Sequence, residues 1–124
     1  MIHYRQFLLL LTMLLTATFG MSQTLIVKDS ITNDNAIGIR YGGDEFLIIA
    51  ANANRKYAED IRKSIIAYIE KENSMGLSPV KFSVSIGYVL TDPRSDKSVI
   101  DYVDEADKLM YEIKNEYHRN NPSD

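Results

Sequence analysis

The sequence contains no cysteine and only two histidines in 124 residues. The absence of cysteine excludes disulfides, thiolate-bound zinc, iron-sulfur clusters and a thiol nucleophile. His3 and His118 stand too far apart in the sequence for a local histidine metal site. Any metal ion would therefore be held by the oxygen atoms of Asp and Glu.

Positive charge is not in excess either. The net charge is −3, and we find no local basic patch, so we expect no nucleic-acid partner. The composition, 45% hydrophobic and 25% charged, is typical of a single compact domain and excludes two full domains. Folding would bury roughly 60 to 70% of the surface of the unfolded chain, which is enough for one core.

A long hydrophobic run is also missing. The apolar run at 7–15 is shorter than the about 20 residues that cross a bilayer, so we expect no membrane span. With His3 and Arg5 before it and the small residues Gly20 and Ser22 after it, the run resembles a secretory signal. A buried helix is the alternative interpretation of the same run.

The clearest periodicity begins at residue 36. Apolar residues alternate with Gly or Arg over 37–41, residues 42–45 interrupt the pattern, and 46–50 form a continuous apolar run. Glycines supply the backbone freedom of a tight turn, so we expect a β-hairpin. The continuous second strand predicts a central strand that is covered on both faces.

An amphipathic helix is predicted from Asn54 to about Glu72, ended by Asn73 and Gly76. Its apolar face consists of Tyr57, Ile61, Ile65 and Tyr68. Residues 80–90 then alternate with a period of two, which predicts a strand.

The last predicted helix begins at Ser98, which forms a capping-box pattern with Asp101. Its apolar stripe consists of Val99, Val103, Ala106, Met110, Ile113 and Tyr117. The order of hairpin, helix, strand and helix predicts an α+β fold with helices layered on a sheet.

The candidate chemistry lies at the tip of the hairpin. Asp44 and Glu45 place two carboxylates on a turn beside Gly42 and Gly43, where a ligand can approach the backbone. Such a pair suits a divalent cation whose shell is completed by phosphate oxygens. An ordinary structural turn has the same residue types.

Three segments, in order, resemble one family. Residues 40–49, Arg-Tyr-Gly-Gly-Asp-Glu-Phe-Leu-Ile-Ile, resemble the signature of the GGDEF diguanylate cyclases; 83–87 resemble a later strand and 106–114 the last helix. The resemblance covers 36 to about 120. It implies an α+β, ferredoxin-like or nucleotide-cyclase-type sheet with helices packed on it, N-terminally incomplete. We divide the chain into an apolar segment, 1–20, and a partial GGDEF domain, 21–124.

The family condenses two GTP into cyclic di-GMP plus pyrophosphate, as a homodimer with one GTP per subunit and with Mg²⁺ or Mn²⁺. By this resemblance, Gly42 and Gly43 lie against the nucleotide and Asp44 ligates the metal. Glu45 assists with the metal or with deprotonation of the attacking 3′-hydroxyl. The reaction is phosphoryl transfer by positioning and charge neutralisation.

Two basic residues would bind phosphate. Lys114 would reach the triphosphate from the last helix, although a solvated helix-end cation is the alternative interpretation. The family has an arginine four residues later, where this chain has His118, and Arg119 is one residue further on. One residue is about 100° of helix rotation, which puts the reach of Arg119 in doubt. Arg40 is expected to support its strand.

The N-terminal part departs from the family. The Asp-x-Asp-x-Phe-Lys strand and the Asn-Asp, Gly-His and Gly-Asp motifs are absent, so a metal carboxylate, the guanine contacts and a candidate for a central strand are missing. A frameshift would explain this, because 4–7 read one base later permits Ile-Asp-Asn-Phe. Likewise, 12–18 read two bases later permits Asn-x-x-Tyr-Gly-His.

We therefore expect a cytoplasmic, impaired cyclase-type domain, because GTP is the substrate. One alternative is a degenerate regulator that binds GTP or a protein partner, although the intact Asp44 and Glu45 argue against it. A second alternative is a small secreted interaction protein, which would follow from cleavage of a signal.

Overall fold

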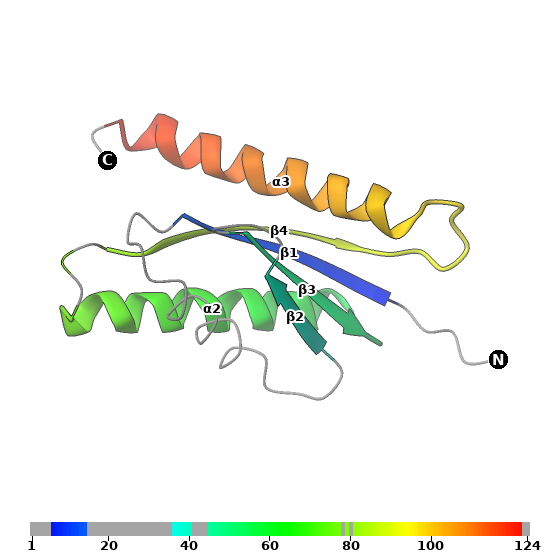
Figure 1. The fold of residues 1–124 in the computed structure, drawn as a ribbon, viewed down its shortest axis with the longest axis horizontal. Helices are drawn as coiled ribbons and strands as arrows, with labels where there is room; N and C mark the ends of the chain where they lie inside the picture. Colours follow the sequence, from blue (N-terminus) through cyan, green and yellow to red (C-terminus); the bar gives the residue numbers. More distant parts are fainter. Residues whose placement is uncertain (1–5, 15–35, 41–44, 78, 80, 123–124) are drawn as a thin grey trace.

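A computed structural model describes the backbone of residues 6–14, together with residues 36–40, 45–77, 79 and 81–122. The elements, labelled as in Figure 1, are β1 (Gln6–Leu14), β2 (Ala36–Arg40), β3 (Glu45–Ala51), α2 (Arg55–Met75), β4 (Ser83–Leu90) and α3 (Val99–Asn120).

The strands form one antiparallel sheet in the order β2-β3-β1-β4. Helices α2 and α3 lie on opposite sides of this sheet, and α3 runs back along β4 (Figure 1). The predicted α+β fold, with helices packed on a cyclase-type sheet, is therefore confirmed.

The apolar N-terminal run forms the central strand β1. Leu10 pairs with Leu47 of β3 on one side and with Gly87 of β4 on the other. The expectation that this sheet has no candidate for a central strand was wrong, and so was the buried-helix interpretation. A short apolar run does not distinguish strand from helix, because a strand that is covered on both faces of its sheet also tolerates continuous apolar residues.

The predicted hairpin is confirmed by the antiparallel pairing of β2 with β3. Successive residues of β3 face opposite sides of the sheet. Phe46, Ile48 and Ala50 belong to the core under α2, whereas Leu47 and Ile49 pack with residues of α3. The strand is thus covered on both faces, as its apolar run predicts.

The bounds of α2 follow from its caps. Asn54 accepts a hydrogen bond from the backbone N–H of Tyr57 (2.9 Å), and Gly76 ends the helix with a φ of 64°. Asn73 was predicted to end the helix but lies inside it. Its side chain instead bonds both backbone groups of Phe82, with the amide donating at 2.8 Å and the carbonyl accepting at 2.7 Å.

The capping box of α3 is present. The Ser98 hydroxyl accepts from the N–H of Asp101 (3.2 Å), and the Asp101 carboxylate accepts from the N–H of Ser98 (2.7 Å). These bonds to Ser98 lower the pKa of Asp101. The buried residues of α3 are Tyr102, Ala106 and Met110, whereas Val99, Ile113 and Tyr117 of the predicted stripe are exposed. The prediction of this apolar stripe was therefore only partly correct.

Helix α3 packs unusually close to β4 at Gly87. A Cβ atom there would lie 2.2 Å from the backbone oxygen of Ala106 and 2.5 Å from the backbone nitrogen of Met110. Both residues have no exposed surface. Because only glycine permits this approach, Gly87 fixes the height of α3 above the sheet.

Candidate functional site

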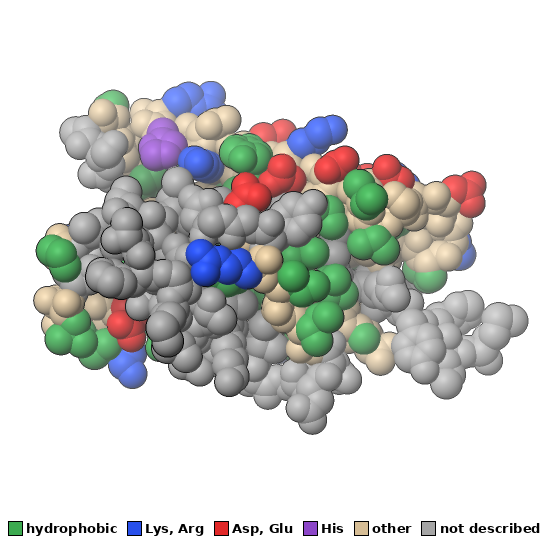
Figure 2. Space-filling view, in the orientation of Figure 1, with side chains coloured by type: hydrophobic (Ala, Val, Ile, Leu, Met, Phe, Trp, Pro, Cys, Tyr) green, Lys and Arg blue, Asp and Glu red, His purple; other side chains and the backbone are tan. Residues whose placement is uncertain are grey.

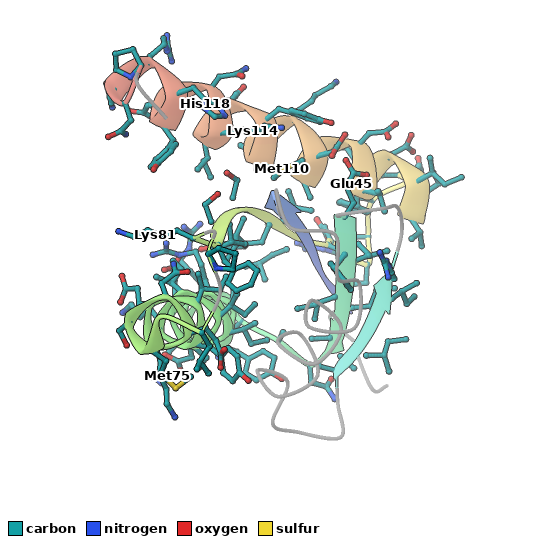
Figure 3. All side chains as sticks on the ribbon, turned by 60° about the vertical axis from the view of Figure 1, so that its left-hand side comes forward. Glu45, Met75, Lys81, Met110, Lys114 and His118 are labelled. Atoms are coloured by element: carbon teal, nitrogen blue, oxygen red, sulfur yellow. The ribbon has the colours of Figure 1, made fainter. Side chains whose placement is uncertain are left out.

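Glu45, the first residue of β3, is the part of the predicted hairpin tip that the structure describes. Its side chain is half-buried and lies beside α3 (Figure 3). Gly42, Gly43 and Asp44 lie outside the described residues. The roles given to these three residues stay predictions.

Tyr111 of α3 connects the tip to the helix. Its hydroxyl lies 3.4 Å from the Oε1 atom of Glu45 and donates a long hydrogen bond to it. Tyr111 is not among the residues predicted from the sequence, although it lies within 106–114, the segment that resembles the last helix of the family. Its position directly after the buried Met110 could have placed it at the rim of the contact between α3 and the sheet.

Lys114 lies next to Tyr111 on the same helix. Its Nζ atom is 5.6 Å from the centroid of the Tyr111 ring, within the range of a cation–π contact. Residues three apart share a helix face, and Figure 3 shows Lys114 and Glu45 on the α3 side of the sheet. Two of the predicted site residues, Glu45 and Lys114, therefore both contact one tyrosine.

Arg119 is not brought into this group. It is exposed on the last turn of α3, and in the described part of the chain it makes no hydrogen bond or ion pair. His118, at the position of the family's arginine, packs edge-on against Tyr117 with ring centroids 5.8 Å apart. Arg40 lies 5.9 Å from the centroid of the Phe46 ring, as expected for a residue that supports its strand.

The electrostatic surroundings of α3 are mainly acidic. Acidic side chains line α3 on the face shown in Figure 2, and His118 lies near its C-terminal end. Asp107, one turn before Tyr111, is half-buried, and this burial together with the nearby Asp104 raises its pKa. Lys114 is thus a cation on a helix that carries several carboxylates.

The residues fit a hard divalent cation in the kind of donor they offer. A carboxylate oxygen, such as those of Glu45, is the ligand that Mg²⁺ and Mn²⁺ prefer. Over the described ranges, no three Asp, Glu, His or Cys side chains gather into a metal cluster. The other ligands would therefore have to come from Asp44, from phosphate oxygens and from water.

A second polar group, formed by Tyr88 of β4 with Glu59 and Arg62 of α2, lies on the α2 side of the sheet. The Tyr88 hydroxyl donates to Glu59 (2.7 Å), which also pairs with Arg62 (2.9 Å). These contacts, Tyr88 first, lower the pKa of Glu59, while burial and Glu59 raise the pKa of Tyr88. This group lines a groove along β4 between α2 and α3, whose lining includes neither Glu45 nor Lys114. The groove is separate from the predicted site.

A cyclase-type sheet with a carboxylate at its hairpin tip and a lysine on the last helix is the arrangement that the three sequence segments predict. Comparison with protein families gives the same result, because the model for "Diguanylate cyclase, GGDEF domain" matches residues 22–121. The chain belongs to the GGDEF family. The match begins earlier than the resemblance noted from residue 36.

Two curated relatives carry different activities in their names. The chain is 33% identical over 90 residues to "Diguanylate cyclase VdcA" of Vibrio cholerae serotype O1, covering 69% of this chain and 26% of the relative. It is 30% identical over 92 residues to "Cyclic di-GMP phosphodiesterase PdeR" of Escherichia coli K12, covering 73% of this chain and 14% of the relative. The alignments thus span about a quarter and a seventh of these proteins.

Solved structures share the fold. The GGDEF domain of TpbB (YfiN) from Pseudomonas aeruginosa has a TM-score of 0.70 at 21% identity, covering 90% of this chain and 73% of that one. An EAL/GGDEF domain protein from M. capsulatus has a TM-score of 0.72 at 19% identity, covering 92% of this chain and 81% of that one. The GGDEF domain of Caulobacter crescentus DgcB, in complex with c-di-GMP, has a TM-score of 0.68 at 19% identity, covering 90% of this chain and 73% of that one. In the described part of this chain, neither helix is suited to cross a membrane.

Proposed function

We propose that this chain is a diguanylate cyclase-type domain that binds GTP with a divalent metal at the hairpin tip but does not convert it into cyclic di-GMP. The observation that carries the proposal is the contact of Glu45 with Tyr111, with Lys114 beside it. This arrangement gathers a carboxylate and an ammonium group from two elements at one end of the sheet. Metal and triphosphate require these two charge types.

The roles follow the family pattern. Gly42 and Gly43 let the nucleotide approach the backbone, and Asp44 and Glu45 hold Mg²⁺ or Mn²⁺. The bound ion would neutralise the charge of the triphosphate. Lys114 binds the triphosphate, and Arg119 contributes more weakly because it is exposed on the last turn.

The central strand explains why turnover is expected to fail. In the family, a strand carries a further metal carboxylate, but Gln6–Leu14 contains no Asp or Glu. The residue of β1 directly opposite Glu45 is Thr12. Threonine carries no charge, so the position paired with Glu45 does not supply the missing carboxylate.

The proposal includes the family's other requirements. A catalytic form would be a homodimer with one GTP in each subunit, because two nucleotides must meet for the condensation. The cytoplasm, where GTP is available, is the compartment in which the domain would act.

Calorimetric titration of the chain with GTP, with and without Mn²⁺, tests this proposal. We expect GTP to bind with Mn²⁺ present, and we expect Asp44→Asn and Glu45→Gln to weaken this binding about tenfold or more. Glu70→Gln, an exposed carboxylate of α2, is the matched control and should change nothing. Equal affinity in all four proteins would overturn the proposed site.

A degenerate regulator is the second candidate, favoured by the similarity to a relative named as a phosphodiesterase. A regulator that uses only the fold would bind GTP or a protein partner independently of metal. A GTP affinity that is the same with and without Mn²⁺ and is unaffected by Glu45→Gln would support this function over the first.

A further inference from the structure

The hydroxyl of Tyr111 reaches the Glu45 carboxylate while its ring lies under the Lys114 ammonium group. One side chain thus contacts both of the charged residues that the proposed function assigns to metal and to triphosphate. We propose that Tyr111 is a positioning residue that sets the spacing between Glu45, on the metal side of this site, and Lys114, on its phosphate side. This inference rests on the proposed function.

The position of Tyr111 is fixed by the packing around it. Met110, the preceding residue, is fully buried, and its backbone lies against Gly87 of β4. Helix α3 therefore cannot approach or leave the sheet at this point without a clash or a void. Since Glu45 begins a strand of the same sheet, the close contact of α3 with β4 also holds Tyr111 at a constant distance from Glu45.

The two contacts of Tyr111 use different parts of the side chain. The hydroxyl acts as a hydrogen-bond donor toward one carboxylate oxygen of Glu45, which orients the carboxylate for a ligand at its other lone pairs. The ring offers its negative face to Lys114, which restricts an otherwise flexible cation. Removal of the hydroxyl alone should release the Glu45 carboxylate on the metal side. Removal of the ring should release Lys114 on the phosphate side as well.

This division gives a test with two arms. Tyr111→Phe keeps the ring, and we expect it to lower the affinity for Mn²⁺, measured by calorimetry, about tenfold. Its binding of GTP without metal should remain within twofold of the unmodified chain. Tyr111→Leu loses both contacts and should weaken both the binding of Mn²⁺ and the metal-free binding of GTP.

Tyr117 provides the matched control. It is a tyrosine of the same helix with similar exposure, 46% against 42% for Tyr111. Tyr117→Phe and Tyr117→Leu should leave both affinities unchanged. A uniform loss in all four variants would show damage to α3 as a whole and would overturn the positioning role.

A measurement without metal tests the contact itself. The ¹³C chemical shift of the Glu45 side-chain carboxyl should change in Tyr111→Phe and stay constant in Tyr117→Phe. An unchanged shift would overturn the proposal, whatever the metal data show.

If the shift changes while Glu45→Gln leaves Mn²⁺ affinity intact, the contact stands and the proposed metal role of Glu45 fails. If Glu45→Gln lowers Mn²⁺ affinity and Tyr111→Phe does not, the positioning role alone fails.

Discussion

The two faces of the sheet are built differently. Among the described residues, the core under α2 contains ten buried residues, five of which are isoleucines, such as Ile48 and Ile65. Among the same described residues, the buried core under α3 consists of four, and the helix backbone itself rests on Gly87. The residues of the candidate site, Glu45 and Lys114, belong to the α3 side. In the described part of the chain, the α2 face therefore holds more of the buried apolar side chains, while close backbone contact on the α3 face positions the site.

The largest expected effect comes from the α2 face. Ile65→Ala removes a fully buried side chain and should lower the free energy of unfolding by about 3 kcal/mol, measured by urea denaturation. Because Ile65 lies on the opposite face, Mn²⁺ affinity should be unchanged wherever the variant is folded. Ile66→Ala, at a half-buried neighbour, should cost clearly less. A loss of Mn²⁺ affinity in folded Ile65→Ala would contradict the separation of the two faces.

Gly87→Ala tests the α3 face. The added methyl group would meet backbone atoms of Ala106 and Met110, so α3 must move, at a cost of about 2 kcal/mol. Unlike Ile65→Ala, this change should also shift the ¹³C signal of the Glu45 carboxyl, because Tyr111 moves with the helix. Ser83→Ala, at the exposed start of the same strand, is the control. A destabilised Gly87→Ala with an unchanged Glu45 signal would show that α3 does not position the tip.

Lys114→Ala should weaken the binding of GTP about tenfold, equivalent to about 1.4 kcal/mol, through loss of a phosphate contact. Lys108→Ala, an exposed lysine of the same helix, should leave GTP affinity within twofold. Arg119→Ala should have an intermediate effect because of its exposed position. Equal losses for Lys114 and Lys108 would indicate general attraction of the anion instead of a defined contact.

The smallest effect is expected at the start of α3. Ser98→Ala should cost about 1 kcal/mol through loss of the cap. Bonds to Ser98 lower the pKa of Asp101, so this carboxylate stabilises the fold above its unfolded pKa, about 3.9. The contribution is lost as the pH falls through the folded pKa. Asp101→Asn should therefore be destabilised at pH 7 and approach the unmodified chain near pH 2, as measured by thermal denaturation.

Much of the fold could be predicted because local signals and tertiary structure agree. The hairpin, both helices and the cap at Ser98 follow from periodicity and capping residues, whereas the cap at Asn54 was not predicted. The central strand β1 was missed because a leucine-rich run carries no period that distinguishes strand from helix. Its assignment depends on its two strand neighbours, which only the folded chain supplies.

The candidate site could be predicted only in part. Glu45 and Lys114 were found because they lie in segments that resemble a family. Tyr111 was missed because its importance comes from a contact across 66 residues of sequence, which no local pattern records. The role of Gly87 likewise depends on how closely α3 approaches the sheet.

The possibility of a frameshift can be examined separately from the folded protein. Sequencing the gene would show whether the alternative frames encode Ile-Asp-Asn-Phe and Asn-x-x-Tyr-Gly-His. A chain rebuilt with these segments should convert GTP, and Asp44→Ala or Glu45→Ala should abolish this activity without unfolding it. An inactive rebuilt chain would contradict the roles given to both carboxylates.

The central claim is that the site binds GTP with metal but lacks the carboxylate that turnover requires. The most direct test is incubation of the unmodified chain with GTP and Mg²⁺ or Mn²⁺, followed by chromatographic separation of the nucleotides. Each 1.36 kcal/mol of lost transition-state stabilisation lowers the rate about tenfold, so loss of a metal ligand should suppress the reaction below detection. We expect unchanged GTP and no cyclic di-GMP. Accumulation of cyclic di-GMP and pyrophosphate over several turnovers would contradict the account.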